Sequence, residues 1–199
     1  MVNPSVSRRS FLSTWLIWTA AFLAFPLAGV AGTAVAGRVD NPLSALIGGA
    51  VAGLVIGAAQ ALLSRRRLDL RRWAPATAVG MGAGLLLGAA AVGYRTSLAA
   101  LLVMGAVTGL LLGVAQAAAL ASAIGRRRWI WGAAMPILWV LGWTATTLGG
   151  IDVAQQFTVF GAYGALTFSA LSGVLLHYLL PYGAASGPRS ASTPVEATV

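Results

Sequence analysis

Two glutamines carry the polar chemistry that is available inside the apolar segments of this chain. Gln60 and Gln116 are the only strongly polar side chains well within long apolar stretches. An amide donates and accepts hydrogen bonds but does not titrate, so it cannot relay a proton. Two interpretations remain open: the glutamines bond to neighbouring helices, or they line a small central cavity that binds or passes a neutral solute.

Small residues at four-residue spacing precede each glutamine. At about 100° per residue, such positions fall on one narrow face of a helix. In lipid, small side chains let two helix backbones approach closely, and the resulting van der Waals packing supplies much of the attraction. The residues that we expect at helix contacts are Gly49, Gly53, Gly57, Gly105, Gly109, Gly113, Gly161, Ala165 and Ser169. The polar positions that follow them are Gln60, Gln116 and Ser172.

This pattern recurs after 56 residues, and the turns on the opposite side recur with it. Gly37, Gly93 and Gly149 share one position of the repeat, and Trp73 aligns with Trp129. We therefore expect three helical hairpins that all begin on the same side of a membrane, which makes them parallel repeats about an axis along the membrane normal. The predicted hairpins cover residues 14–64, 73–124 and 129–180.

The composition is that of a membrane protein. Of the 199 residues, 58% are hydrophobic and 9% are charged, well below the charged fraction of a soluble domain. Each of six apolar stretches is long enough to cross about 30 Å of hydrocarbon, and without an alternating barrel pattern only helices can do so. The predicted spans are 14–36, 43–64, 73–93, 97–124, 129–149 and 156–180. The fold class is therefore all-α, a polytopic membrane protein with six transmembrane helices. An arginine anchor at residues 1–13 precedes them, and a disordered tail at residues 181–199 follows.

Arginine placement predicts the orientation. The outer side holds Arg38 and Arg95, whereas the other eleven of the 13 arginines lie on the opposite side. Because basic residues favour the cytoplasm, both termini are expected there, in the cytoplasmic membrane. One alternative is that Ser7–Ser13 belongs to a twin-arginine export signal; its cleavage would leave five spans and would cut into the repeat.

The residue types exclude several chemistries. Without cysteine, thiolate metal sites cannot form within the chain, and its single histidine, His177, excludes a bis-histidine haem. His177 follows Ser169 and Ser172 on one helix at offsets that do not favour a serine–histidine pair. We therefore expect no catalytic residue, no cofactor and no metal site, and the protein is not expected to be an enzyme. The net charge of +9 comes from arginines between apolar segments, which favours anionic headgroups over nucleic acid as the partner.

The carboxylates lie in loops or in the tail. Coupled transporters commonly use a carboxylate within their spans, so the sequence disfavours coupled transport. Asp40 and Asp152 are expected to act as turn formers and helix caps, with a cation at the outer mouth as the alternative. The tryptophans near the predicted cytoplasmic surface are expected to form an aromatic belt at the headgroups. They are Trp15, Trp18, Trp73, Trp129 and Trp131.

The repeated G-x-x-x-G-x-x-x-G-x-x-Q helices, over most of residues 37–173, resemble those of uncharacterised bacterial multi-pass membrane proteins. That resemblance implies a shared fold and no established activity. We expect a non-enzymatic accessory or structural membrane component, surrounded by lipid and in contact with other membrane proteins or with a second copy. The alternative is a passive small-solute channel or the substrate-binding subunit of a multi-component importer. Six spans and cytoplasmic termini resemble the membrane-embedded components of energy-coupling-factor vitamin importers, although the chain has no cluster of polar ligands.

Overall fold

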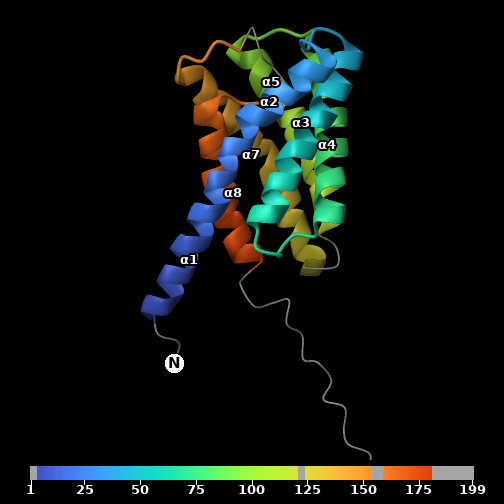
Figure 1. Ribbon diagram of the computed structural model, residues 1–199. Helices are drawn as coiled ribbons and strands as arrows, with labels where there is room; N and C mark the ends of the chain where they lie inside the picture. Colours follow the sequence, from blue (N-terminus) through green and yellow to red (C-terminus); the bar gives the residue numbers. More distant parts are fainter. Residues whose placement is uncertain (1–3, 121–123, 154–158, 181–199) are drawn as a thin grey trace, which may run out of the picture.

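A computed structural model describes the backbone of residues 4–120, 124–153 and 159–180, and the side chains of these segments from residue 11 onward. All regular elements in these segments are helices (Figure 1). The first membrane segment is continuous but not uniform: α1 (Pro4–Thr19) leads through a short 3₁₀ helix (Ala20–Leu23) into α2 (Ala24–Ala36). Proline lacks the amide hydrogen that would bond to the carbonyl four residues earlier, and Pro26 accounts for this local change of helix type.

The remaining helices have the length of membrane spans. In chain order they are α3 (Pro42–Leu63), α4 (Leu70–Ala91), α5 (Leu98–Ala119), α7 (Arg128–Leu148) and α8 (Ala162–Leu179), with a 3₁₀ turn at Gly125–Arg127 before α7. Five helical segments are long and apolar enough to cross a membrane: Phe11–Ala36, α3, α4, α5 and α8. The expected helical membrane protein is thereby confirmed at this coarser level. Helix α7 has 21 residues, but its tryptophans and threonines make it less apolar than those five.

Short polar caps start three of these helices. The Asn41 side chain accepts a hydrogen bond from the Ser44 amide at 3.0 Å, Asp69 caps α4 through the Arg71 amide at 2.9 Å, and Ser97 caps α5 through the Ala100 amide at 3.4 Å. Such caps satisfy amides that have no partner within the helix. The capping role expected of Asp40 belongs instead to Asn41, whose side-chain amide donates to the Asp40 carboxylate at 2.8 Å.

The helices follow one another around the bundle in chain order. Contacts join α2 to α3, α3 to α4, α4 to α5, α5 to α7, and α7 to α8. Helix α8 then contacts α1 and the 3₁₀ turn after it, which closes the ring (Figure 1). The start of α1 and the end of α8 lie at the same end of the bundle, together with the arginine-rich α3–α4 connection.

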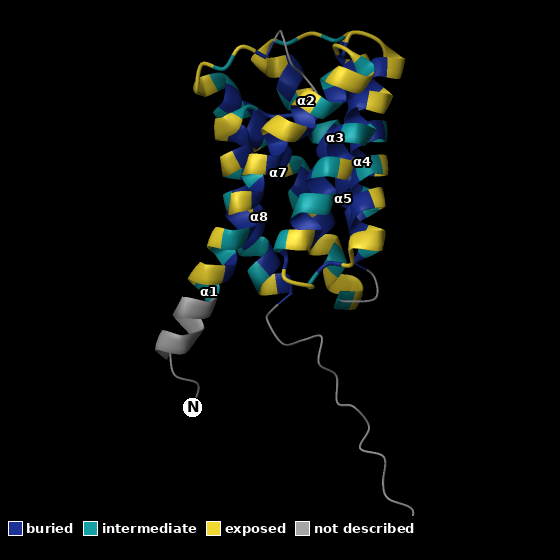
Figure 2. Ribbon diagram, viewed as in Figure 1, coloured by how far each residue is buried: buried dark blue, intermediate teal, exposed yellow. Residues whose placement is uncertain are grey.

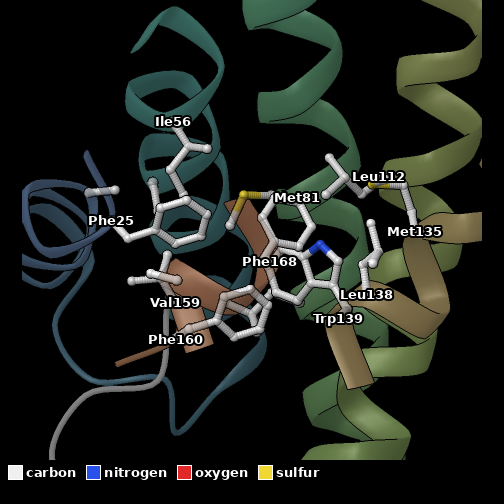
Figure 3. Close-up of a cluster of buried hydrophobic side chains, with 14 of the residues drawn as sticks. Phe25, Ile56, Met81, Leu112, Met135, Leu138, Trp139, Val159, Phe160 and Phe168 are labelled. Atoms are coloured by element: carbon white, nitrogen blue, oxygen red, sulfur yellow. The ribbon is translucent and has the colours of Figure 1, made fainter. Parts of the chain in front are cut away.

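Side chains from all around the ring fill its interior. Figure 3 shows Phe25, Ile56, Met81, Leu112 and Phe168 pointing toward one another from five helices. Among them, Ile56, Leu112 and Phe168 are buried and stand 56 residues apart.

The outer surface of the ring is apolar. Leu54, Leu110 and Leu166, again 56 residues apart, are exposed on it. Figure 2 shows the buried residues turned inward and the exposed ones outward along these helices. The bundle thus has a packed core and an apolar exterior, as a helical protein in lipid requires.

Several helix ends differ from the predicted span bounds, most of all those of the sixth and fourth spans. The sixth span was expected to begin near residue 156, but α8 begins at Ala162. Val159 and Phe160 lie outside the helix, and the Phe160 ring packs in the core with its centroid 4.5 Å from that of Trp139. Helix α5 ends at Ala119, before the expected residue 124. The predicted disordered tail at residues 181–199 lies outside the described residues.

Candidate functional site

The polar interior is built from glutamine and tryptophan pairs. Gln60 on α3 has 2% of its surface exposed, and its Oε1 accepts a hydrogen bond from Trp73 Nε1 of α4 at 3.1 Å. A buried tryptophan N–H usually finds an acceptor, because an unsatisfied donor in an apolar interior is costly. The pair joins the first glycine-rich helix to the helix that follows it.

Gln116 makes the same connection one repeat later and adds a second. Its Oε1 accepts from Trp131 Nε1 of α7 at 2.9 Å, and its Nε2 donates to Thr77 Oγ1 of α4 at 3.0 Å. Thr77 in turn donates to the carbonyl oxygen of Trp73 at 2.8 Å. With 1% of its surface exposed, Gln116 therefore connects three consecutive helices through one amide.

Ser172 takes the corresponding place on α8. Trp18 Nε1 of α1 donates to Ser172 Oγ at 3.0 Å, although the two residues are far apart in the chain. Trp15 Nε1 adds a bond of 2.8 Å to the carbonyl oxygen of Ala170. Tryptophan N–H donors thus join α1 to α8, as they join α4 to α3 and α7 to α5.

The three tryptophans meet inside the bundle. The Trp131 ring lies edge-on to Trp73, with centroids 5.6 Å apart, and to Trp18, at 6.3 Å. Edge-to-face geometry at such distances is the favourable arrangement for aromatic pairs. The expectation of a headgroup belt was wrong for all three, since each is 1% exposed. Trp129 is half exposed, in keeping with that expectation.

The glycines of α3 face α4 at backbone contact. A methyl group added at Gly53 would lie 2.6 Å from the Thr77 carbonyl oxygen, and one at Gly49 would lie 2.8 Å from that of Met81. At Gly57, the added carbon would lie 2.8 Å from Thr77 Cβ. Only glycine permits this separation of the two helices.

The glycines of α5 face α7 in the same way. An added methyl group at Gly109 would lie 2.6 Å from Pro136 Cα, and one at Gly105 would lie 2.7 Å from Trp143 Cδ1. Gly113 faces the Gly132 carbonyl, whose usual helical donor is missing because Pro136 has no amide hydrogen.

The third set of expected packing residues is arranged differently. Gly161 is the N-cap of α8 and contacts Ile151 rather than α1. Ala165 and Ser169 are fully buried. Close approach of α8 to the first segment occurs at Gly173, where an added methyl group would lie 2.7 Å from Trp18 Cδ1.

A further glycine face on α4 did not enter the sequence-based expectations. Gly80, Gly84 and Gly88 face α5, and a methyl group at Gly84 would lie 2.7 Å from Thr108 Cα. Their four-residue spacing was the available signal, although no glutamine follows them.

In the described part of the chain, Ser172 and His177 each contact other residues. Ser172 accepts from Trp18 and donates to the Ser169 carbonyl, while the His177 ring packs against Phe11 with centroids 4.8 Å apart. In residues 4–120, 124–153 and 159–180, no group of three histidine, cysteine or acidic side chains is placed to hold a metal ion. Comparison of the chain with protein-family models, with curated proteins and with solved structures yields no match.

Proposed function

We propose that this chain is a non-enzymatic integral protein of the cytoplasmic membrane, serving as a structural or accessory component that other membrane proteins contact. The single observation that carries this proposal is the bonding of the two buried glutamines. The side-chain oxygen of each glutamine accepts a hydrogen bond from a tryptophan of a neighbouring helix, which favours packing between helices as the role of this polar position.

The proposed topology has six spans as three hairpins, with both termini in the cytoplasm. Helix α7 supports the sixth span, because its 21 residues match a bilayer crossing at about 1.5 Å per residue. It also packs between α5 and α8 in the ring. An even number of crossings agrees with the start of α1 and the end of α8 lying at one end (Figure 1).

The three-hairpin repeat is supported by bonds and contacts that recur around the ring. A polar residue near the end of α3, α5 and α8 accepts from a tryptophan of the next helix. The G-x-x-x-G-x-x-x-G-x-x-Q pattern behind two of these positions also favours grouping the chain with the multi-pass proteins that carry it. That grouping implies a fold, and experiments have to identify the partner proteins.

Solute flux separates the proposal from its main alternative. The full chain, reconstituted into proteoliposomes, is subjected to osmotic shock with water, glycerol and urea while shrinkage is followed by light scattering. A structural component leaves the rates equal to those of protein-free liposomes, because it provides no pathway for the solute. Faster flux of a neutral solute would support the passive channel and overturn the proposal.

Crosslinking tests the partner side of the proposal. A diazirine amino acid is placed at one of three exposed positions, Leu54, Leu110 or Leu166. The matched control places it at Leu112, which is buried on the same helix as Leu110. After irradiation in native membranes, we expect discrete protein adducts from at least one exposed position and only internal products from Leu112. Lipid adducts alone from all the exposed positions would contradict an accessory role.

A further inference from the structure

The connection between α3 and α4 forms a small basic cavity at the end of the bundle. The cavity has a volume of about 180 Å³ and is lined by Arg66, Arg67, Asp69 and Arg72, with apolar residues beneath them. Three guanidinium groups and one carboxylate leave an excess of positive charge around it. At ~30 Å³ per water molecule, it has room for about six waters, or for a phosphate group with part of its hydration shell.

We propose that this cavity binds the phosphate of an anionic phospholipid headgroup. Guanidinium groups match phosphate oxygens in geometry as well as in charge, since each presents parallel N–H donors. Basic pockets beside membrane helices are where such headgroups bind. The proposal assigns one site among the many arginines of this end of the bundle, and it does not depend on the proposed structural role.

The arginines are positioned by different parts of the fold. Arg67 Nη2 donates to Thr14 Oγ1 of α1 at 3.0 Å, which ties this loop to the first helix. Arg66 adopts a left-handed backbone conformation with φ of 67°, directly after Arg65 with φ of 54°. Non-glycine residues seldom adopt this conformation, so the tight turn of this loop raises its conformational free energy.

Asp69 and Arg72 form an ion pair within this loop, and its geometry is loose. Arg72 Nε lies 3.6 Å from Asp69 Oδ2, and both side chains are more than half exposed. An exposed pair of this kind contributes little to stability. Asp69 also accepts a hydrogen bond from the Arg71 amide at 2.9 Å, so this carboxylate serves the start of α4 as well as Arg72.

The apolar part of the lining favours a lipid over a free phosphate ion. Leu68, Trp73 and Leu120 are buried and line the cavity together with the arginines. The cavity lies where α3 and α5 end and α4 begins, at the end of the bundle that the proposed topology places in the cytoplasm. A diacyl phosphate ester can place its phosphate among the arginines while its chains follow the exposed apolar helix surfaces.

The test compares two double variants of the full chain. Arg66→Gln with Arg72→Gln removes two arginines that line the cavity, whereas Arg65→Gln with Arg71→Gln removes two that do not, and all four side chains are exposed. Both variants lose the same net charge. Phosphatidylglycerol retention, measured by native mass spectrometry against phosphatidylcholine, should fall about tenfold for the first variant and less than twofold for the second.

Three outcomes would overturn the assignment. Equal losses in both variants would mean diffuse attraction to the basic surface, and no loss in either would mean that the cavity does not bind the headgroup. Displacement of phosphatidylglycerol by millimolar inorganic phosphate would assign the cavity to a soluble anion instead. Melting temperatures in phosphatidylcholine control for folding, and the single variants Arg72→Gln and Arg71→Gln repeat the comparison if the first double variant is unstable.

Discussion

A single amide, that of Gln116, connects α4, α5 and α7. Each interhelical hydrogen bond within a membrane contributes about 0.6 kcal/mol on average and up to ~1.7 kcal/mol. Gln116 makes two such bonds, to Trp131 and Thr77, whereas the bond found for Gln60 is the one from Trp73. Loss of Gln116 should therefore destabilise the fold more than loss of Gln60.

A double-mutant cycle on Gln116→Leu and Trp131→Phe tests this bond. Each single change leaves a buried polar group without its partner, while the double change removes both. We expect a coupling of about 1 kcal/mol in the free energy of unfolding, measured by denaturant titration in detergent. The cycle Gln60→Leu with Trp73→Phe should give coupling of the same sign, and Gln116→Leu alone should cost more than Gln60→Leu.

Additive effects in both cycles would show that the indole groups do not bond to the amides. Leu110→Ala, on the exposed surface of α5, provides the control for changes that leave the interior intact.

The glutamines could be recognised from the sequence as the polar groups within the spans, but their partners could not. Trp73 and Trp131 follow arginine clusters, a position typical of headgroup tryptophans, and only tertiary packing turns their rings inward. The Ser172 and Trp18 pair joins opposite ends of the chain, so no local pattern could predict it.

Between elements, the separation of neighbouring helices is set by glycine. Gly53→Ala and Gly109→Ala each place a carbon 2.6 Å from backbone atoms of the next helix, which must move away. Overpacking of this kind costs about 1–3 kcal/mol, more than the ~1 kcal/mol gained when alanine replaces glycine within a helix. We expect both variants to melt at a lower temperature in detergent.

Gly132→Ala is the matched control for these substitutions. Its added carbon would meet its nearest neighbour, the Gly113 carbonyl oxygen, at 3.2 Å, so the same gain in helix propensity comes with a milder contact. Equal stability of all three variants would mean that the α3–α4 and α5–α7 contacts tolerate wider spacing than the structure implies.

The 56-residue period of the sequence matches the spacing between α3 and α5 but not the spacing between α4 and α7. Helices α3 and α5 begin 56 residues apart. In α4, Thr77 lies against Gly57, and in α7, Met135 lies against Gly113. Thr77 and Met135 are 58 residues apart in the sequence. Trp131 rather than Trp129 therefore corresponds to Trp73. A shift of two residues, through the 3₁₀ turn before α7, hides this correspondence from a fixed-period alignment.

For the molecule as a whole, the proposed orientation makes a prediction about accessibility. The chain has no cysteine, so a single introduced one reports its position without further changes. With six crossings, an impermeant maleimide added to intact cells should label Thr96→Cys, and should label Ala191→Cys only after permeabilisation. Labelling of both in intact cells would mean an odd number of crossings.

Composition and arginine distribution were sufficient to predict an all-helical membrane protein, because the physics of a bilayer leaves few alternatives. The order of packing around the ring was not predictable from hydropathy. It depends on which small-residue face meets which neighbour, and α4 carries such residues toward both sides, with Gly82 near α3 and Gly84 near α5.

The closure of the ring by α8 has a consequence for biosynthesis. Translation proceeds from the N-terminus, so the first helix enters the membrane long before its last neighbour exists. Until α8 is made, the indole N–H of Trp18 lacks the hydroxyl of Ser172 that accepts its bond. The contact between the first helix and the last can therefore form only after α8 has been made, so the ring of helices closes late in synthesis.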